Sequence, residues 1–276
     1  GDITGNFGLT LGGGGTITLS GDNSYTGETT ISAGTVIVAS NTGLGAAAGG
    51  TTLASGATLD LAGVAIAAEN LTLQGGTVKD VTSSWGGNIV MTADSTFDIA
   101  GTDTLTVGGV VSGGYKLTKV GAGTLVLGGN NTYSGGTDLN VGLIQLGSNA
   151  GLGTGGVSVA SGAALDLNGK SASNALSITG TGISNSGVLY NGSSSAATVS
   201  GAITLVGDST IKSAGALTLS GAINGAHALQ VTNTGALTLT GGVGQTTALS
   251  SLNVSGASTL GGDISTSGAQ TYQSAM

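Results

Sequence analysis

The chain has 276 residues, of which 56 are glycine and none is proline or cysteine. Its formal net charge is −8 and its five basic residues are all lysines, so the clustered cationic surface that nucleic-acid binding needs is not expected. The mean hydropathy of +0.37 argues against a disordered linker, and glycine at this density excludes long helices. No apolar run reaches the roughly 18 residues of a membrane-spanning helix. The start at Gly1 lacks a basic, apolar signal segment, so we expect a piece of a larger exported precursor.

Short strings of alternating apolar and polar residues recur along the chain, and each predicts a short β-strand. In the first half they lie at 16–19, 35–38, 57–61, 70–73, 104–107, 116–120 and 124–127. In the second half they lie at 143–146, 157–160, 164–167, 203–206, 216–219, 228–231, 236–239 and 252–254. Glycine, asparagine, aspartate and serine separate the strings and supply turns.

The alternation also predicts which side chains face the core. In the first string, Ile17 and Leu19 are expected to point inward and the threonines outward. Asp60 and Asp166 each stand between two leucines, so both are expected to point to solvent.

The sequence contains an internal duplication. Residues 16–45 align without a gap with residues 124–153, at an offset of 108, and share Asn23/Asn131 and Tyr25/Tyr133. The strings SGATLDLAG (55–63) and SGAALDLNG (161–169) continue the match. We therefore expect one continuous segment, 1–276, with repeats at about 12–120 and 120–234 and a third unit that begins near 235.

Serial repeats of short strands with no helix between them favour a β-solenoid over a sandwich or a propeller. The lack of proline agrees, because nearly every backbone N–H of a solenoid strand bonds to the next coil. The predicted fold class is all-β, a right-handed parallel β-helix with about 20 residues per coil.

Residues 123–147 and 15–40 resemble the autotransporter-associated β-strand repeat: a GTL-type strand, a turn region with Gly, Asn, Tyr and Thr, and a second strand. The resemblance implies the passenger domain of a large Gram-negative surface adhesin, exposed outside the cell and folded as a right-handed β-helix. Glu28 stands where the pattern has a second glycine.

No residue is predicted to be catalytic, cofactor-binding or metal-binding. His227 is the single histidine and, with no cysteine in the chain, is interpreted as a turn or surface residue. Asp94, Asp98 and Asp103 form the densest acidic cluster, but the glycine-rich calcium-roll pattern is absent, so solvated turns are favoured.

Three further motifs are interpreted as structural features rather than as functional sites. The glycines at 151, 153 and 156 match G-x-G-x-x-G, but no helix follows, so a solenoid corner explains them better. Asn23 and Tyr25, like Asn131 and Tyr133, are expected to hold a turn through side-chain bonds to backbone. Trp85 is placed in a loop, where it could mark a contact surface.

The leading functional hypothesis is a non-catalytic adhesive rod at the bacterial cell surface that contacts host or cell-surface receptors. The alternative is a filament subunit that joins copies of itself end to end through exposed solenoid edges. Ice binding, suggested by T-x-T strings, and polysaccharide cleavage are less favoured. No cofactor, nucleic-acid partner or membrane-spanning segment is expected in this portion.

Overall fold

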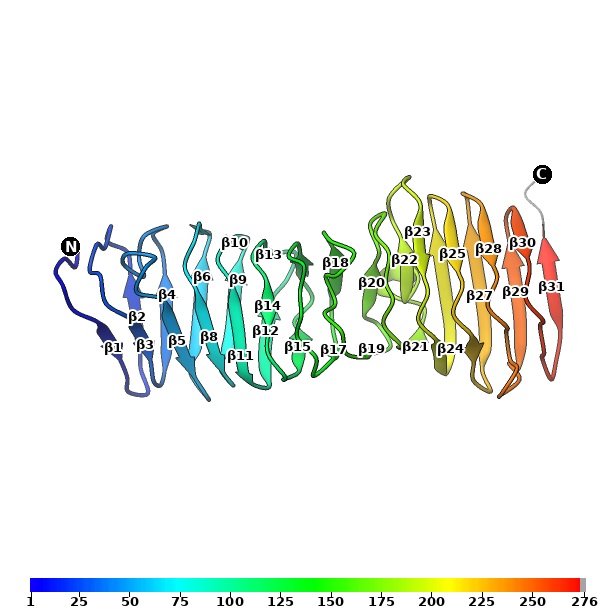
Figure 1. Cartoon of the computed structure of the whole chain (residues 1–276), viewed down its shortest axis with the longest axis horizontal. Helices are drawn as coiled ribbons and strands as arrows, with labels where there is room; N and C mark the ends of the chain where they lie inside the picture. Colours follow the sequence, from blue (N-terminus) through cyan, green and yellow to red (C-terminus); the bar gives the residue numbers. More distant parts are fainter. Residues whose placement is uncertain (274–276) are drawn as a thin grey trace. The chain divides into compact units, whose positions relative to one another are not determined.

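The computed structural model describes residues 1–273 and divides into two compact units, residues 1–137 and the residues from 138 onward. Each unit is a stack of β-coils whose strands pair in parallel with those of the next coil (Figure 1). Leu9 pairs with Thr29 in the first unit and Leu217 with Leu237 in the second, so these turns take 20 residues. The predicted parallel β-solenoid is confirmed, whereas its right-handed sense stays a prediction.

The strands of the first unit form three parallel ladders. The first ladder consists of β1 (Leu9–Leu11), β3 (Thr29–Ile31), β5 (Thr51–Ala54), β8 (Leu71–Gln74), β11 (Ile89–Ala93) and β14 (Val111–Ser112). The second consists of β2 (Thr16–Leu19), β4 (Thr35–Val38), β6 (Thr58–Ala62), β9 (Thr77–Val81), β12 (Ser95–Ile99) and β15 (Leu117–Val120). The third consists of β7 (Ala65–Ile66), β10 (Ser83–Trp85), β13 (Thr104–Val107) and β16 (Thr124–Leu127).

The second unit repeats this arrangement. One ladder holds β19 (Val157–Val159), β21 (Leu176–Gly180), the start of the long strand β24 (Ile203–Ser213) and β26 (Ile223–Asn224). Another holds β18 (Leu143–Leu146), β20 (Ala164–Asp166), β22 (Leu189–Asn191), the end of β24, β27 (Ala228–Asn233), β29 (Ser251–Ser255) and β31 (Gln270–Gln273). The last holds β23 (Ala197–Val199), β25 (Leu217–Leu219), β28 (Leu237–Leu239) and β30 (Ser258–Leu260). A 3-10 turn, η1 (Ile183–Asn185), follows β21, and β17 (Thr137–Leu139) lies at the boundary between the units.

Apolar side chains stack in register inside each unit and form its core. In the first unit Val36, Leu59, Val78 and Phe97 occupy one column, and all are almost completely buried. Each such side chain contributes roughly 1.5–3 kcal/mol on burial. Alternation within a strand therefore becomes a continuous apolar column once the coils stack.

The predicted alternation is confirmed for Leu19, which is buried, but Ile17 is 38% exposed. Ile17 pairs with the buried Val36, so its direction follows the prediction. Its exposure arises because β2 pairs on one side only among the described strands, and no other described coil covers Ile17.

On strands β9 and β15 of the first unit, an aspartate and a lysine occupy inward positions. Asp80 stands between Leu61 and Ile99, and burial raises its pKa, with Ser83 opposing that effect. Lys119 is fully buried beside Phe97 in the register of β12 and β15. Its Nζ donates to the carbonyl oxygens of residues 120 and 121 at 2.7 and 2.8 Å, and burial lowers its pKa to about 8.

Trp85 does not lie in an exposed loop, so that prediction is wrong. It belongs to β10, is 1% exposed, and stacks in register between Ile66 and Val107. The glycines that follow it suggest a loop, yet Ser83 and Trp85 share the inward face of a strand.

The alternation predicts that both Asp60 and Asp166 point to solvent. Asp60 is partly exposed as predicted, but Asp166 is buried, so the prediction for Asp166 is wrong. The carboxylate of Asp166 accepts hydrogen bonds from the backbone N–H groups of Asn168 and Gly192 at 2.8 and 2.9 Å. The side chain of Gln145 donates to it at 3.0 Å. Neighbouring coils thus cover an outward carboxylate and satisfy its oxygens.

The turns with the repeated Asn and Tyr are held as predicted, but by bonds between coils. Asn23 accepts from the N–H of Ile3 at 2.8 Å and donates to the carbonyl of Gly43 at 2.6 Å. Asn131 likewise accepts from the N–H of Val111 at 2.8 Å. Tyr25 is fully buried, and its hydroxyl bonds to the hydroxyl of Thr29.

Threonines form a continuous column on the outer face of the first unit that the T-x-T strings do not reveal. Six of them pair in register on consecutive coils: Thr16, Thr35, Thr58, Thr77, Thr96 and Thr118. Two positions further along these strands, the neighbouring column contains Ile37, Asp60 and Lys79. The face is therefore chemically mixed, with a column of threonines beside a column that contains apolar and charged side chains.

Candidate binding groove

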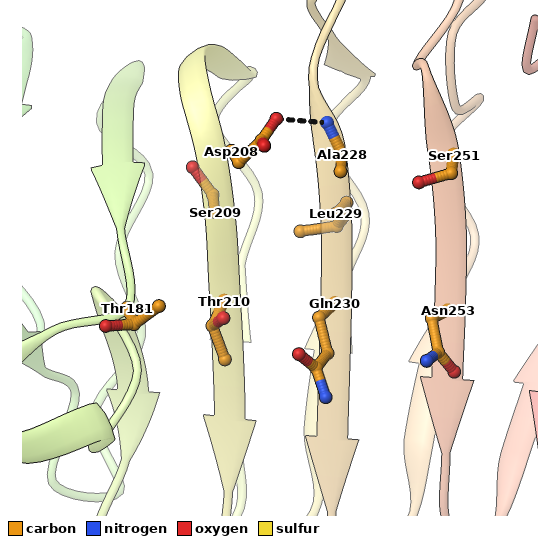
Figure 2. Close-up of a pocket in the computed structure, with 9 residues that line it drawn as sticks. All are labelled: Thr181, Asp208, Ser209, Thr210, Ala228, Leu229, Gln230, Ser251 and Asn253. Carbon is orange, nitrogen blue, oxygen red and sulfur yellow. Dashed lines mark hydrogen bonds between the residues drawn. The ribbon is translucent and has the colours of Figure 1, made fainter.

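A polar groove of about 320 Å³ opens on the outer surface of the second unit, over β24, β27 and β29 (Figure 2). Its lining residues are Thr181, Asp208, Ser209, Thr210, Ala228, Leu229, Gln230, Ser251 and Asn253. The groove is the candidate functional site because outward polar side chains converge there from neighbouring coils.

The floor of the groove is built by register. Thr210, Gln230 and Asn253 pair across the three strands, so their side chains stand side by side on the outer face. Figure 2 shows Thr181 continuing this row. Hydroxyl and amide groups therefore follow one another across adjacent coils.

One end of the groove is shaped by an irregularity in β24. The pairing with β21 shifts between Ile178 and Gly180, and Gly180 pairs with Ser209. The extra residues place Asp208 at the rim, where its Oδ1 accepts the N–H of Ala228 at 2.9 Å (Figure 2). Bulges of this kind redirect side chains at the edges of sites.

The lining offers hydrogen bonds rather than acid–base chemistry. Among the described residues that line the groove, Asp208 is the one carboxylate, whereas glycoside hydrolysis uses two facing carboxyl groups. The amide oxygen of Asn253 is buried without a hydrogen-bond partner in the described structure. The arrangement fits a neutral, polar ligand held by hydroxyl and amide groups.

His227 lies beside this groove but not in its lining, in the turn before β27. Its Nδ1 is 3.9 Å from Oδ1 of Asp208, and its side chain is 40% exposed. The interpretation as a turn or surface histidine is confirmed.

The acidic cluster is not brought together in space. Asp94 accepts the N–H of Lys116 at 2.8 Å, Asp98 lies 3.7 Å from Nζ of Lys79, and Asp103 accepts from Thr82. Within residues 1–273 no group of three metal-ligating side chains forms. In the same residues no helix is long and apolar enough to cross a membrane.

The glycine motif at 151, 153 and 156 falls in the loop between β18 and β19, where Gly153 has φ 63°. This is the solenoid corner that the sequence predicts. The groove could not be predicted from the sequence in the same way, because Gln230 and Asn253 become neighbours only through the pairing of β27 with β29.

The fold and the groove define a repeat-built β-solenoid with a polar outer surface, and comparison with known proteins narrows this class. Residues 9–38 and 117–146 each match the passenger-associated-transport-repeat family, and the two matches begin 108 residues apart. The predicted resemblance to autotransporter passengers is therefore confirmed over these segments.

A longer stretch is similar to a curated protein. Over 134 residues, 48% of this chain, the sequence is 34% identical to the "Adhesin BmaC autotransporter" of Brucella suis biovar 1 (strain 1330). The matched stretch spans 3% of the length of that relative. No solved structure matches the chain.

Proposed function

We propose that this chain is part of the passenger of an autotransporter-type adhesin and acts as a non-catalytic, adhesive rod at the bacterial surface. The observation that carries the proposal is the pair of passenger-repeat matches, each of which lies on stacked parallel coils. The similarity to an autotransporter adhesin over about half the chain supports it.

The duplicated sequence supports the mechanical part of this role. A solenoid lengthens by adding coils that contact their neighbours, so duplication extends a rod without a new core. We propose that the repeats at about 12–120 and 120–234, with a third from about 235, form one continuous solenoid. Its partners would be receptors on host or other cell surfaces, with the groove over β24, β27 and β29 as a contact region.

The test is adhesion of beads coated with the full chain to cultured epithelial cells. The proposal predicts saturable binding that soluble chain inhibits and that Gln230→Ala with Asn253→Ala weakens. Thr72→Ala, an outward substitution on β8 of the first unit, is the matched control and should bind normally. Binding no greater than that of albumin-coated beads would contradict the adhesive role.

Two further measurements decide between this proposal and its rivals. Electron microscopy of the purified chain should show separate particles, and fibres would favour the filament alternative. Turnover of an acidic polysaccharide would contradict the non-catalytic assignment.

A further inference from the structure

A second cavity, of about 300 Å³, lies in the first unit beneath the long loop between β4 and β5. Residues of the loop at 41–47 form one wall, and residues 66–69, which run from the end of β7 into the following turn, form the other, with Asn23 and Ser24 completing the lining. Leu44, Ala46, Ala47 and Ile66 give the pocket an aliphatic lining.

The loop over this pocket is fixed by bonds to the neighbouring coil. Asn23 donates to the carbonyl of Gly43 at 2.6 Å, and the N–H of Ala46 donates to the carbonyl of Tyr25 at 2.9 Å. Gly45 has φ 87°, and a side chain there would collide with the ring of Tyr25. The pocket is therefore preformed.

Glu69 places a carboxyl group in this pocket. It is 3% exposed, and its Oε1 accepts the hydroxyl of Thr51 at 2.8 Å. Among the described residues that line the pocket, Glu69 is the one with an ionisable side chain, so no lining cation balances its charge.

The second repeat shows that the scaffold does not need this carboxyl. The aligned strings NLTL and ALSI place Asn174 at the position of Glu69, and Val157 at the position of Thr51. Asn174 donates to the loop carbonyls of Gly153 and Gly155 at 3.1 and 2.8 Å. A neutral amide thus ties down the loop of the second repeat.

The loop itself also differs between the repeats. Five residues, AAAGG at 46–50, separate Gly45 from Thr51, whereas three residues, TGG at 154–156, separate Gly153 from Val157. The loop of the first repeat is therefore two residues longer and has an alanine-rich wall at the place where this repeat carries a buried carboxyl.

Burial has a cost for the charged carboxylate that a bound cation would offset. Burial raises the pKa of Glu69 to about 7, and the bond from Thr51 opposes the shift. Burial raises the pKa of the Tyr25 phenol, the bond to Thr29 opposes that shift, and the charge on Glu69 adds to it, so this phenol is another titratable group that senses Glu69. An unbalanced carboxylate in an aliphatic pocket favours a positively charged ligand.

We propose that this pocket binds a primary ammonium group on a short aliphatic stem, such as a lysine side chain of a partner or a free alkylamine, with Glu69 as the counter-ion. The aliphatic walls take the stem, and the carboxylate takes the ammonium. A divalent metal is not favoured, because no group of three metal-ligating side chains forms in residues 1–273.

The experiment titrates the full chain with n-butylammonium chloride and follows backbone NMR signals. The proposal predicts saturable shifts confined to residues 23–24, 41–47 and 66–69. Because the ionised share of a group with a pKa of about 7 falls steeply below neutrality, affinity should drop about 30-fold between about pH 8 and about pH 5.5.

Three controls make the result decisive. Glu69→Gln keeps the size and the acceptor for Thr51, and should weaken binding at least about tenfold. Glu28→Gln, at an exposed glutamate that does not line the pocket, should leave it unchanged, and n-butanol, which lacks the charge, should give no saturable shifts. Equal binding by n-butanol, an unaffected Glu69→Gln variant, or no shifts up to about 100 mM amine, a concentration that detects even weak binding, would overturn the proposal. Since none of these readouts involves cells, failure here is distinct from failure of the adhesive role.

Discussion

The loop after β4 and the loop after β18 start with nearly the same sequence, but different polar side chains form the hydrogen bonds beneath them. Beneath the first lies the Thr51–Glu69 pair, a hydroxyl donating to a buried carboxyl. At the aligned position of the second, Asn174 donates to loop carbonyls. The coil therefore uses a polar group at this position in both repeats, whereas the carboxyl of the first repeat adds a charge that the second repeat folds without.

Among substitutions in the part of the loop that the two repeats share, one at Gly45 should destabilise the fold most. Gly45→Ala adds a Cβ that lies 2.7–2.8 Å from atoms of Tyr25, at a φ of 87°. Overpacking and backbone strain together should lower the free energy of unfolding by about 4 kcal/mol, as measured by urea denaturation. Gly56→Ala, at φ 77° with nothing within 4 Å, carries the backbone cost alone and should lose about 1 kcal/mol. Equal losses would refute the packing role of Tyr25.

The distinctive part of the first loop can be tested through pH. The pKa of Glu69 is about 7 in the folded chain, against 4.5 for an unperturbed glutamate, so the unfolded chain gives up this proton first as the pH rises. The stabilising contribution is complete below about pH 4.5 and is lost as the pH passes 7, a change of about 3 kcal/mol. The difference in unfolding free energy between wild type and Glu69→Gln should trace this change. A difference that stays constant from acid to neutral pH would contradict it.

The amide of the second loop should matter through its hydrogen bonds. Asn174→Ala leaves the carbonyls of Gly153 and Gly155 without their side-chain donor and should cost about 2 kcal/mol of unfolding free energy. Asn140→Ala, at an exposed asparagine of the same unit, is the control and should cost less than about 0.5 kcal/mol. Increased hydrogen exchange at residues 151–156 should accompany the loss in Asn174→Ala.

The smallest effect is expected where the two repeats agree. Tyr25→Phe and Tyr133→Phe each remove a buried hydroxyl that bonds to the threonine four residues on. Each should lower the free energy of unfolding by about 1 kcal/mol. Costs that differ by more than about 1 kcal/mol would show that the repeats do not use this pair alike.

Much of the fold was predictable because the alternation and the duplication are local properties of the sequence. The inward leucines and the Asn23 and Tyr25 turn follow from residue pattern alone. Lys119 and Asp80 were also within reach, since LTKV and TVKDV place them on the same strand face as Leu117 and Val78. A charged side chain predicts exposure to solvent. The two-residue alternation of the strand nevertheless places these two side chains on its buried face.

The remaining features depend on which residues of neighbouring coils contact one another, and a local sequence pattern does not predict these contacts. Asp166 alternates outward, yet Gln145 and the backbone of the next coil cover it. The row formed by Thr210, Gln230 and Asn253 exists only through pairing across coils. Glu69 follows two alanines and is easily mistaken for a surface charge until the loop above it is in place.

The ionisation of the Glu69 carboxyl can be measured directly by NMR. The chain contains two glutamates, so glutamate labelled with ¹³C at the carboxyl carbon should give two signals, with the exposed Glu28 as the internal reference. We expect the Glu69 signal to titrate with a midpoint near pH 7 and added n-butylammonium to move this midpoint downward. A midpoint at the ordinary value of 4.5, unchanged by the amine, would contradict both the buried carboxyl and the ammonium pocket.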